Sequence, residues 1–349
     1  MSKRIFLSCD PGIDDMAAIL FALADRDVEL LGVGAVAGNV SVETAWTNAR
    51  FACDLVGAAA TPCYAGSSGP LLRDQIFGAH KALGAFRDHL SDLEDSLPEA
   101  RLIAIAPAQT AAVAMAHAIT DAAVTKRPLT LVATGPLTDV ALAIRLAGSE
   151  ACADGIATIV AMGGAFRALG NRAPYAEMNM LSDPHAARMV AESGLPLVLF
   201  PLDVTWQCRL TGPDLDRIEC EAGLIGQIFA RLFRASDREN PVLYGGPGGP
   251  VHDLLTVIWL VAPELFILRR ARISVSTGHE LAGHTSRQLP KAKERDNAGC
   301  KLPHCIADGV ESDAVRALFL DRLKTFSRAS DSNNSDQTRI TTNREEDPQ

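Results

Sequence analysis

Three aspartates lie within six residues near the start of the chain: Asp10, Asp14 and Asp15. An apolar run at residues 5–7 precedes them, and a second apolar run at residues 16–23 follows. The first run is typical of a buried strand and the second of a helix, so the carboxylates occupy the turn between them. In an open α/β sheet that turn lies at the carboxyl end of a strand, where such folds bind their ligands.

Three carboxylates held this close repel one another, and their charge requires compensation. A helix N-terminus contributes only about 0.3–1 kcal/mol for each carboxylate, which is too little for three. A divalent cation supplies enough charge, and carboxylate oxygens are ligands that Ca²⁺ and Mg²⁺ prefer. The alternative is a solvated acidic N-cap, the commoner use of such a cluster when it stands alone.

Strand and helix patterns alternate along most of the chain around this turn. The alternation indicates βαβ units, and we predict an open, mainly parallel central sheet flanked by helices. Proline marks two helix starts: Pro136 precedes a predicted helix at residues 137–146, and Pro184 precedes one at residues 185–192. Proline suits the first helical position because its missing N–H costs nothing there. Asp183 is the expected N-cap of the second of these helices. The predicted strands are residues 5–7, 30–36, 129–133, 156–162, 197–200 and 266–275.

Two loops and a tail complete the organisation. Residues 163–179 follow a strand without helical or strand periodicity, and a long loop at such a place is often functional. Residues 240–250 are rich in Gly and Pro and lead to His252 and Asp253. We predict a single α/β domain over residues 1–326 and a disordered polar tail over residues 327–349.

Composition and charge narrow the classes of function. The 349 residues are 48% hydrophobic and carry a net charge of −9, which opposes binding to nucleic acid or to an anionic membrane. Neither a membrane span nor a signal peptide is evident, so we expect a cytoplasmic protein with reduced cysteines. Cys300, His304 and Cys305 lie close together but fit no standard zinc spacing.

Several polar motifs, weak one by one, together resemble a known family. They occur in the order found in nucleoside hydrolases of the inosine–uridine-preferring type, and the resemblance runs from about residue 4 to residue 275. The motifs are Asp10-Pro11-Gly12-Ile13-Asp14-Asp15, Gly38-Asn39, Ala133-Thr134-Gly135-Pro136-Leu137-Thr138, Met162-Gly163-Gly164 with Gly170-Asn171, Ala176-Glu177-Met178-Asn179 with Asp183-Pro184, Leu202-Asp203-Val204-Thr205, and His252-Asp253.

The resemblance implies a single Ca²⁺ at the base of a ribose pocket. Its ligands would be Asp10, Asp15, Asp253 and the backbone carbonyl of Thr134. Asp10 would also be the general base toward a water molecule whose pKa the cation lowers. For Asp253 a helix N-cap stays open as an alternative, because residues 254–261 have a helical pattern.

The resemblance also implies a ribose-binding set, whose side chains supply the donors and acceptors that sugar hydroxyls need: Asp14, Asn39, Asn171, Glu177 and Asn179. For Asn39 and Asn171 the alternative is a turn residue after glycine. Glu177 and Asn179 are two residues apart, which lets both side chains point the same way on an extended segment.

His252 is the candidate general acid, since its pKa range and two ring nitrogens suit protonation of a purine N7. The alternative is a structural histidine. A histidine at this position resembles the base-nonspecific or inosine–uridine branch of the family. Trp206, Phe166 and Tyr244 could stack on a nucleobase or serve only in packing.

Three places depart from the family pattern. Ser8 stands where the family usually has Asp, and Asp139 replaces the usual Asn. Residues 78–84, which border the base pocket, lack the family's His-Gly-x-Asp arrangement, so the preferred base cannot be carried over.

We therefore predict Ca²⁺-dependent hydrolysis of ribonucleosides to ribose and free base, in purine and pyrimidine salvage, by a homodimer or homotetramer. A non-catalytic nucleoside-binding protein of the same fold is one alternative, and binding without release of ribose would favour it. A metal-dependent phosphohydrolase is another, but the sequence contains no phosphate-binding GxxxxGK[ST] loop.

Overall fold

The computed structural model describes residues 2–78, 83–99, 109–236, 238, 240, 245–290 and 303–342, with side chains described up to residue 327. Its strands are β1 (Lys3–Cys9), β2 (Val28–Ala35), β3 (Cys63–Ala65), β4 (Leu129–Ala133), β5 (Ile156–Met162), β6 (Leu197–Phe200), β7 (Arg209–Leu210), β8 (Gly249–Pro250), β9 (Phe266–Val275), β10 (Thr285–Gln288) and β11 (His304–Val310).

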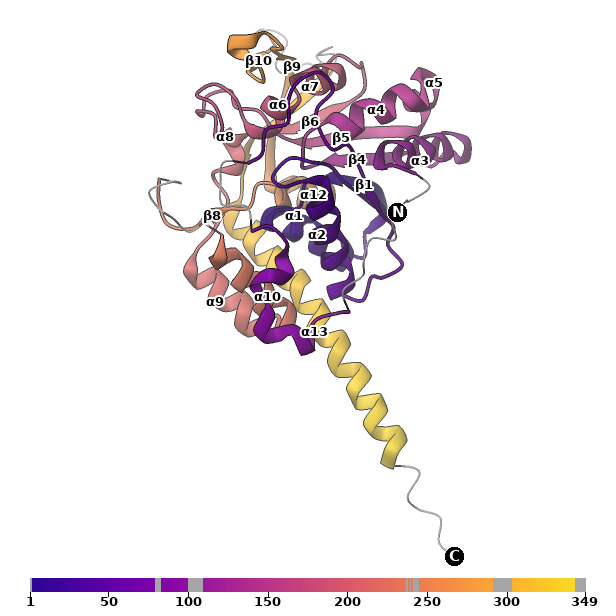
Figure 1. The fold of residues 1–349 in the computed structure, drawn as a ribbon, viewed down its shortest axis with the longest axis vertical. Helices are drawn as coiled ribbons and strands as arrows, with labels where there is room; N and C mark the ends of the chain where they lie inside the picture. The colour runs from indigo at the N-terminus through magenta and orange to yellow at the C-terminus, as the bar shows by residue number, and fades with distance from the viewer. Residues whose placement is uncertain are drawn as a thin grey trace, which may run out of the picture.

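In these described ranges, nine strands form one sheet in the order β10-β9-β11-β6-β5-β4-β1-β2-β3, and β7 pairs with β8 separately (Figure 1). Neighbours from β11 to β3 are parallel. The strand β9 runs antiparallel to both β10 and β11. The predicted open, mainly parallel sheet is therefore confirmed, and all six predicted strands are present.

Helices connect the strands and cover both faces of the sheet. They are α1 (Ile13–Ala24), α2 (Val42–Leu55), α3 (Ala111–Thr125), α4 (Thr138–Ala147), α5 (Ser149–Gly155), α6 (Met178–Ser182), α7 (Pro184–Ala191), α8 (Leu202–Thr205), α9 (Gly212–Glu221), α10 (Gly223–Ala235), α12 (Leu254–Val261) and α13 (Ser312–Thr342). Short 3₁₀ turns are η1 (Phe86–His89), η2 (Ser91–Ser96), η4 (Pro263–Leu265) and η5 (His279–Leu281).

Successive side chains of a strand point to opposite faces, and this alternation builds two hydrophobic cores. In β1, Ile5 and Leu7 pack with α1, α2, α10, α12 and α13 on one face. Phe6, between them, packs on the other face with α3, α4, α5 and α7. Burial on both faces explains why the strands are nearly continuous apolar runs.

The strand order reverses at β1, which has β2 on one side and β4 on the other. Open α/β sheets form a crevice at such a point, beyond the carboxyl ends of the strands. Asp10 directly follows β1, and Thr134 directly follows β4. Asn39 lies four residues beyond the end of β2. The topology therefore brings three separate motifs to one edge.

Both proline-marked helix starts are confirmed to within one residue. Pro184 opens α7, and the Asp183 carboxylate caps this helix by accepting from the Ala186 N–H at 3.0 Å. The helix predicted from residue 137 is α4, which begins at Thr138 with Leu137 as its N-cap. Just before α4, the backbone at Gly135 packs against the Asp10 carboxylate. A Cβ at this glycine would lie 2.8 Å from the carboxylate Oδ1.

The helix α13 (Ser312–Thr342) extends into the segment predicted as a disordered polar tail, and Figure 1 shows it leaving the body of the molecule. The domain boundary at residue 326 and the disorder of the tail stay predictions. Among the described helices, none combines the length and the apolar character needed to cross a membrane.

Candidate active site

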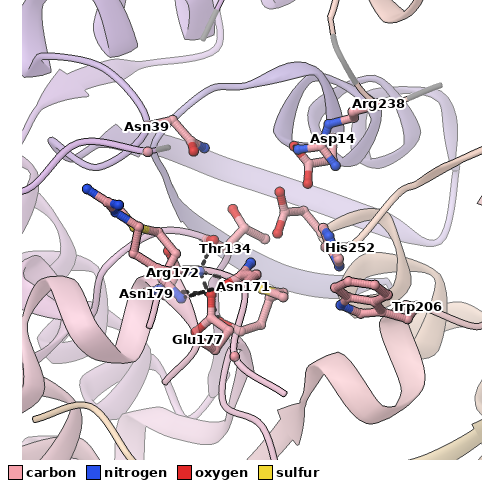
Figure 2. A pocket seen from close by; sticks show the side chains of 15 residues that line it. Asp14, Asn39, Thr134, Asn171, Arg172, Glu177, Asn179, Trp206, Arg238 and His252 are labelled. Atoms are coloured by element: carbon pink, nitrogen blue, oxygen red, sulfur yellow. Dashed lines mark hydrogen bonds and ion pairs between the residues drawn. The ribbon is translucent and has the colours of Figure 1, made fainter. Parts of the chain in front are cut away.

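A cavity of about 270 Å³ opens at the reversal point of the sheet. Figure 2 shows side chains from several strand ends and loops around it. Its described lining is Asp14, Asn39, Gly78, Thr134, Met162, Gly170, Asn171, Arg172, Glu177, Met178, Asn179, Trp206, Arg238, His252 and Asp253. All five residues predicted to bind ribose are in this lining, as are His252 and two of the predicted metal ligands.

Carboxylates from α1 and from the start of α12 meet at the base of the cavity. Asp14, Asp15 and Asp253 each offer an oxygen, and these oxygens lie within 4.8 Å of one another. Asp253 makes no side-chain capping bond at the start of α12. The alternative role of Asp253 as a helix N-cap therefore gains no support. The Asp253 carboxylate is available to the acidic cluster.

Asp10 lies outside that group of three but is as deeply buried, with 1% of its surface exposed. Its Oδ2 accepts from the Asn39 N–H at 2.6 Å. A Cβ at Gly38 would lie 2.1 Å from the same oxygen, so only glycine lets the loop after β2 approach this carboxylate. The short Gly38-Asn39 motif thus fixes the orientation of Asp10.

The electrostatics of the cluster show which carboxylates lack a compensating charge. Burial, together with repulsion between neighbouring aspartates, raises the pKa of Asp15 to about 7 and the pKa values of Asp10 and Asp253 well above their ordinary value. Burial acts on Asp14 too, but Arg238 and His252 hold its pKa below the ordinary value.

Arg238 explains the difference, because its guanidinium lies 2.6 Å from the Asp14 carboxylate. Sequence reasoning did not single out this arginine. It lies 224 positions from Asp14 along the chain, and nothing in its sequence surroundings marks it. Asp14 is thus already paired within the protein, whereas no arginine or lysine among the described residues forms an ion pair with Asp10, Asp15 or Asp253.

Thr134 connects the cluster to the opposite wall of the cavity. Its hydroxyl donates to Asp15 at 2.7 Å, and its carbonyl accepts from the Asn179 side-chain amide at 2.6 Å. A carbonyl oxygen has two lone pairs, so one remains for a further partner. Asn179 is thereby held with its amide nitrogen turned toward the backbone.

Glu177 and Asn179 do not lie on an extended segment as predicted. Glu177 is the N-cap of α6, and Asn179 belongs to the first turn of that helix. The Glu177 carboxylate accepts N–H groups of Gly164, Asn179 and Met180 at 3.1, 2.9 and 3.2 Å. Burial raises its pKa to about 7 despite these bonds. The capping geometry, rather than strand alternation, brings both side chains to the cavity.

The two asparagines that follow glycines make backbone contacts as well as lining the cavity. The Asn171 Oδ1 accepts from the Met178 N–H at 2.9 Å, which closes the loop onto α6. The Asn39 amide donates to the Asp10 carbonyl at 3.3 Å. The turn role and the lining role therefore coexist in both residues.

His252 is buried against α8, with 7% of its surface exposed. Its Nδ1 lies 2.7 Å from the Thr205 hydroxyl. A hydroxyl that donates to Nδ1 leaves the ring proton on Nε2, so this contact can set the tautomer. Figure 2 shows the ring beside Trp206, on the side of the cavity opposite Asn39.

Comparison with known proteins identifies the family to which these cavity residues belong. The family model described as inosine-uridine preferring nucleoside hydrolase matches residues 5–317. The chain belongs to this family. Its resemblance to the family, inferred from the motifs, is confirmed.

Relatives and solved structures agree with the family. A pyrimidine-specific ribonucleoside hydrolase of Klebsiella pneumoniae is 37% identical over 282 residues, 79% of this chain and 85% of that protein. An uncharacterized protein of Schizosaccharomyces pombe is 37% identical over 283 residues, 80% of this chain and 86% of its own. The structure of a purine-preferring ribonucleoside hydrolase from Gardnerella vaginalis has a TM-score of 0.76 and 27% identity, covering 94% of this chain and 100% of that one. The chain is an enzyme, a ribonucleoside hydrolase.

Two departures from the nucleoside hydrolase pattern lie close to the site. The Ser8 hydroxyl is buried and has no hydrogen-bond partner among the residues that the structure describes, while the Ser8 carbonyl accepts the Thr134 N–H at 2.8 Å. Asp139 accepts both the N–H and the hydroxyl of Ser67, at 3.0 and 2.6 Å. Asp139 is thus a structural anchor of the loop after β3, outside the cavity lining.

The aromatic residues proposed to stack on a nucleobase have different surroundings. Trp206 lines the cavity of this nucleoside hydrolase, and the guanidinium of Arg209 lies 5.9 Å from the centre of its ring. Arg287 lies over the Phe166 ring at 5.1 Å, a packing contact. Residues 79–82 of the altered 78–84 segment lie outside the described residues, and so do Tyr244 and Cys300.

His304 serves the sheet rather than a soft-metal site. It is 2% exposed, and its Nδ1 accepts the Ile273 N–H of β9 at 2.9 Å. Burial lowers its pKa. The neutral ring completes the hydrogen bonding between β9 and β11.

Proposed function

We propose that this nucleoside hydrolase cleaves the N-glycosidic bond of ribonucleosides with the help of Ca²⁺, and that it serves purine and pyrimidine salvage. The observation that carries the proposal is the convergence on one cavity of a buried acidic cluster, a set of hydroxyl-binding side chains and His252. The three groups correspond to the three requirements of the reaction: an activated water, a sugar held in place and a protonated leaving group.

The donor set fits a hard divalent cation. Asp10, Asp15 and Asp253 are buried carboxylates with raised pKa values and form no ion pair within the described part of the chain, and Thr134 adds a carbonyl oxygen. Ca²⁺ takes six to eight oxygen ligands, so these four residues leave places for ribose hydroxyls and water. When bound, the ion orients the ribose hydroxyls and lowers the pKa of the attacking water.

Asp10 is the proposed general base. The Asn39 N–H holds one oxygen of its carboxylate, so the other oxygen remains to accept the proton of the attacking water. Burial that raises a carboxylate pKa makes it a better base near neutral pH. The close packing of Gly38 keeps this geometry without added side-chain atoms.

The ribose-binding set offers both donors and acceptors. Arg238 keeps Asp14 ionised, so Asp14 accepts from a hydroxyl. Asn179 donates with its amide nitrogen to Thr134, which leaves its Oδ1 to accept. Glu177, with a pKa of about 7, accepts as a carboxylate or donates as a carboxylic acid. Contacts that strengthen as positive charge develops on the sugar accelerate the reaction.

His252→Ala is expected to lower kcat for inosine by about 10²-fold or more, because the hypoxanthine would leave without its proton. A 4-nitrophenyl riboside, whose leaving group departs as a stable anion, is expected to lose less than about threefold. Steady-state kinetics on the two substrates test the general-acid role. Equal losses on both would remove it.

Thr205→Val is expected to lower kcat for inosine about tenfold, equivalent to roughly 1.4 kcal/mol, since Nδ1 of His252 loses its partner. KM is expected to stay within about twofold, and the limb of the pH–rate profile that reports His252 is expected to shift. Thr205→Ser, which keeps the hydroxyl, is the matched rescue. A loss that Ser does not restore would assign Thr205 to packing alone.

A reducing-sugar assay on inosine, uridine, cytidine, adenosine and guanosine, with and without chelator, tests the proposed function. Named relatives are pyrimidine-specific or purine-preferring, so the panel also gives the base preference. Calorimetric affinity for ribonucleosides without release of ribose would instead favour the nucleoside-binding alternative. Restoration by Ca²⁺ and not by Mg²⁺ is the result expected for the metal.

The proposal extends to a homodimer or homotetramer, as the resemblance to the family implies, and to the cytoplasmic location expected from the sequence. Light scattering on the purified chain measures the oligomeric state directly. A monomer at assay concentration with full activity would contradict this part alone.

A further inference from the structure

A pair of cysteines lies away from the active site, where α2 leads into β3. The Sγ atoms of Cys53 and Cys63 are 3.9 Å apart. Cys53 is completely buried near the end of α2, whereas Cys63, the first residue of β3, is only half-buried. A disulfide bond is about 2.05 Å long, so the sulfurs have about 1.9 Å to close. Cys63 is the member of the pair that a small oxidant can reach.

A fixed cation stands beside Cys63. The Nη1 of Arg50 lies 3.5 Å from the Cys63 Sγ and also donates to the Thr61 carbonyl at 2.6 Å. Its Nη2 donates to the Ala58 carbonyl at 3.0 Å. These backbone bonds hold the guanidinium against the turn that joins α2 to β3, so its position beside the sulfur is set by the fold.

The charges around the pair favour a thiolate on Cys63. A hydrogen bond from the Cys53 thiol and the charge of Arg50 lower the pKa of Cys63, against the opposing effects of burial and of Asp54. Asp54 pairs with Arg50 at 2.9 Å and offsets part of its charge. The same hydrogen bond, together with burial, raises the pKa of Cys53. Cys63 is thus the nucleophile and Cys53 the proton-bearing partner.

We propose that Cys53 and Cys63 are a peroxide-sensitive modification site, at which they form a reversible intramolecular disulfide. The sequence separation, the juxtaposed sulfurs and the fixed guanidinium distinguish this pair from a solitary cysteine. Disulfides that form transiently in a reducing compartment are usually redox-responsive.

The oxidation proceeds in two balanced steps. The Cys63 thiolate attacks one oxygen of hydrogen peroxide, the O–O bond breaks, and the departing hydroxide takes a proton to become water, leaving a sulfenic acid on Cys63. Cys53 then attacks the Cys63 sulfur, the S–O bond breaks, and hydroxide leaves with the Cys53 proton as a second water. Two thiols lose two electrons, and one peroxide becomes two waters. A thiol reductant reverses the bond.

The test treats the folded, full-length protein with hydrogen peroxide at pH 7, blocks free thiols with N-ethylmaleimide and maps peptides without reduction by mass spectrometry. A cross-linked peptide that joins Cys53 to Cys63 is expected, and dithiothreitol is expected to remove it. Cys220 is an exposed thiol on α9 and serves as the internal reference. Cys63 is expected to lose its free thiol at least about tenfold faster than Cys220.

Two variants separate the roles of the pair. In Cys53→Ser the sulfenic acid on Cys63 has no resolving thiol, so dimedone is expected to trap it and further oxidation to a sulfinic acid is expected. In Cys63→Ser, Cys53 is expected to stay a free thiol. Circular dichroism confirms that each variant folds. If either variant does not fold, the rate of oxidation of Cys63 relative to that of Cys220 in the wild-type chain tests the proposal.

Three results would overturn the proposal. The first is an absence of the cross-linked peptide in the oxidised wild-type protein. The second is oxidation of Cys63 no faster than that of Cys220. The third is a dimedone adduct on Cys63 that forms equally in the wild-type protein and in Cys53→Ser.

Discussion

Asp10→Asn is expected to lower the release of ribose by about 10⁴-fold while the protein stays folded. The amide keeps the shape of the carboxylate and can still accept the Asn39 N–H, but it cannot take a proton from water. Because the pKa of Asp10 is raised by burial and by Asp15, removing its charge relieves repulsion in the cluster. Reducing-sugar kinetics with saturating Ca²⁺ measure the loss of activity. A thermal melt in chelator measures the gain in stability from the relieved repulsion.

Asp139→Asn is the matched control for this experiment. Asp139 is also a buried aspartate, at 1% exposure, but it holds Ser67 and lies outside the cavity lining. Its variant is expected to keep kcat within about twofold and to stay folded, because the asparagine Oδ1 can still accept a hydrogen bond from Ser67. If Asp139→Asn were as inactive as Asp10→Asn, or if Asp10→Asn kept a tenth of the wild-type rate, the role of Asp10 as base would fail.

The strand-end residues of this site could be predicted because local sequence determines them. An apolar run identifies a buried strand, and the first polar residues after it must lie at the edge of the sheet. Asp10 after β1 and Thr134 after β4 follow from that rule. The parallel order of the strands then brings these ends together, so residues that are each predicted from local sequence form one site.

The residues whose roles sequence reasoning missed are those whose partners are distant along the chain. Arg238 neutralises Asp14 across 224 positions of sequence, and Thr205 contacts His252 across 47. Neither pairing leaves a periodic signal. Asn179 lies in the cavity lining, but it belongs to a helix and not to the predicted extended segment, because a helix N-cap at Glu177 has no sequence pattern distinct from an extended loop. Tertiary packing, rather than local propensity, settles such contacts.

Without Ca²⁺, the free energy of unfolding of the enzyme is expected to fall as pH rises. With Ca²⁺ bound, this fall is expected to be reversed. Asp10, Asp15 and Asp253 have raised pKa values in the folded chain, so between about pH 4 and 7 the folded state binds more protons than the unfolded state. The free energy of unfolding therefore falls as pH rises through this window. A cation binds the ionised carboxylates, so its stabilising effect grows over the same range.

Thermal melts at pH 5 and pH 8, with chelator and with Ca²⁺ at about 100 times its Kd, measure this linkage. At pH 8 Ca²⁺ is expected to raise Tm by about 5 °C or more, and at pH 5 by much less. Glu177 also titrates near pH 7, but it contributes with and without the ion, so the difference between the melts isolates the cluster. Asp15→Asn is expected to flatten the pH dependence in chelator. A Ca²⁺ shift of equal size at both pH values would mean that the ion binds elsewhere, because binding to these carboxylates is coupled to the loss of their protons in this range.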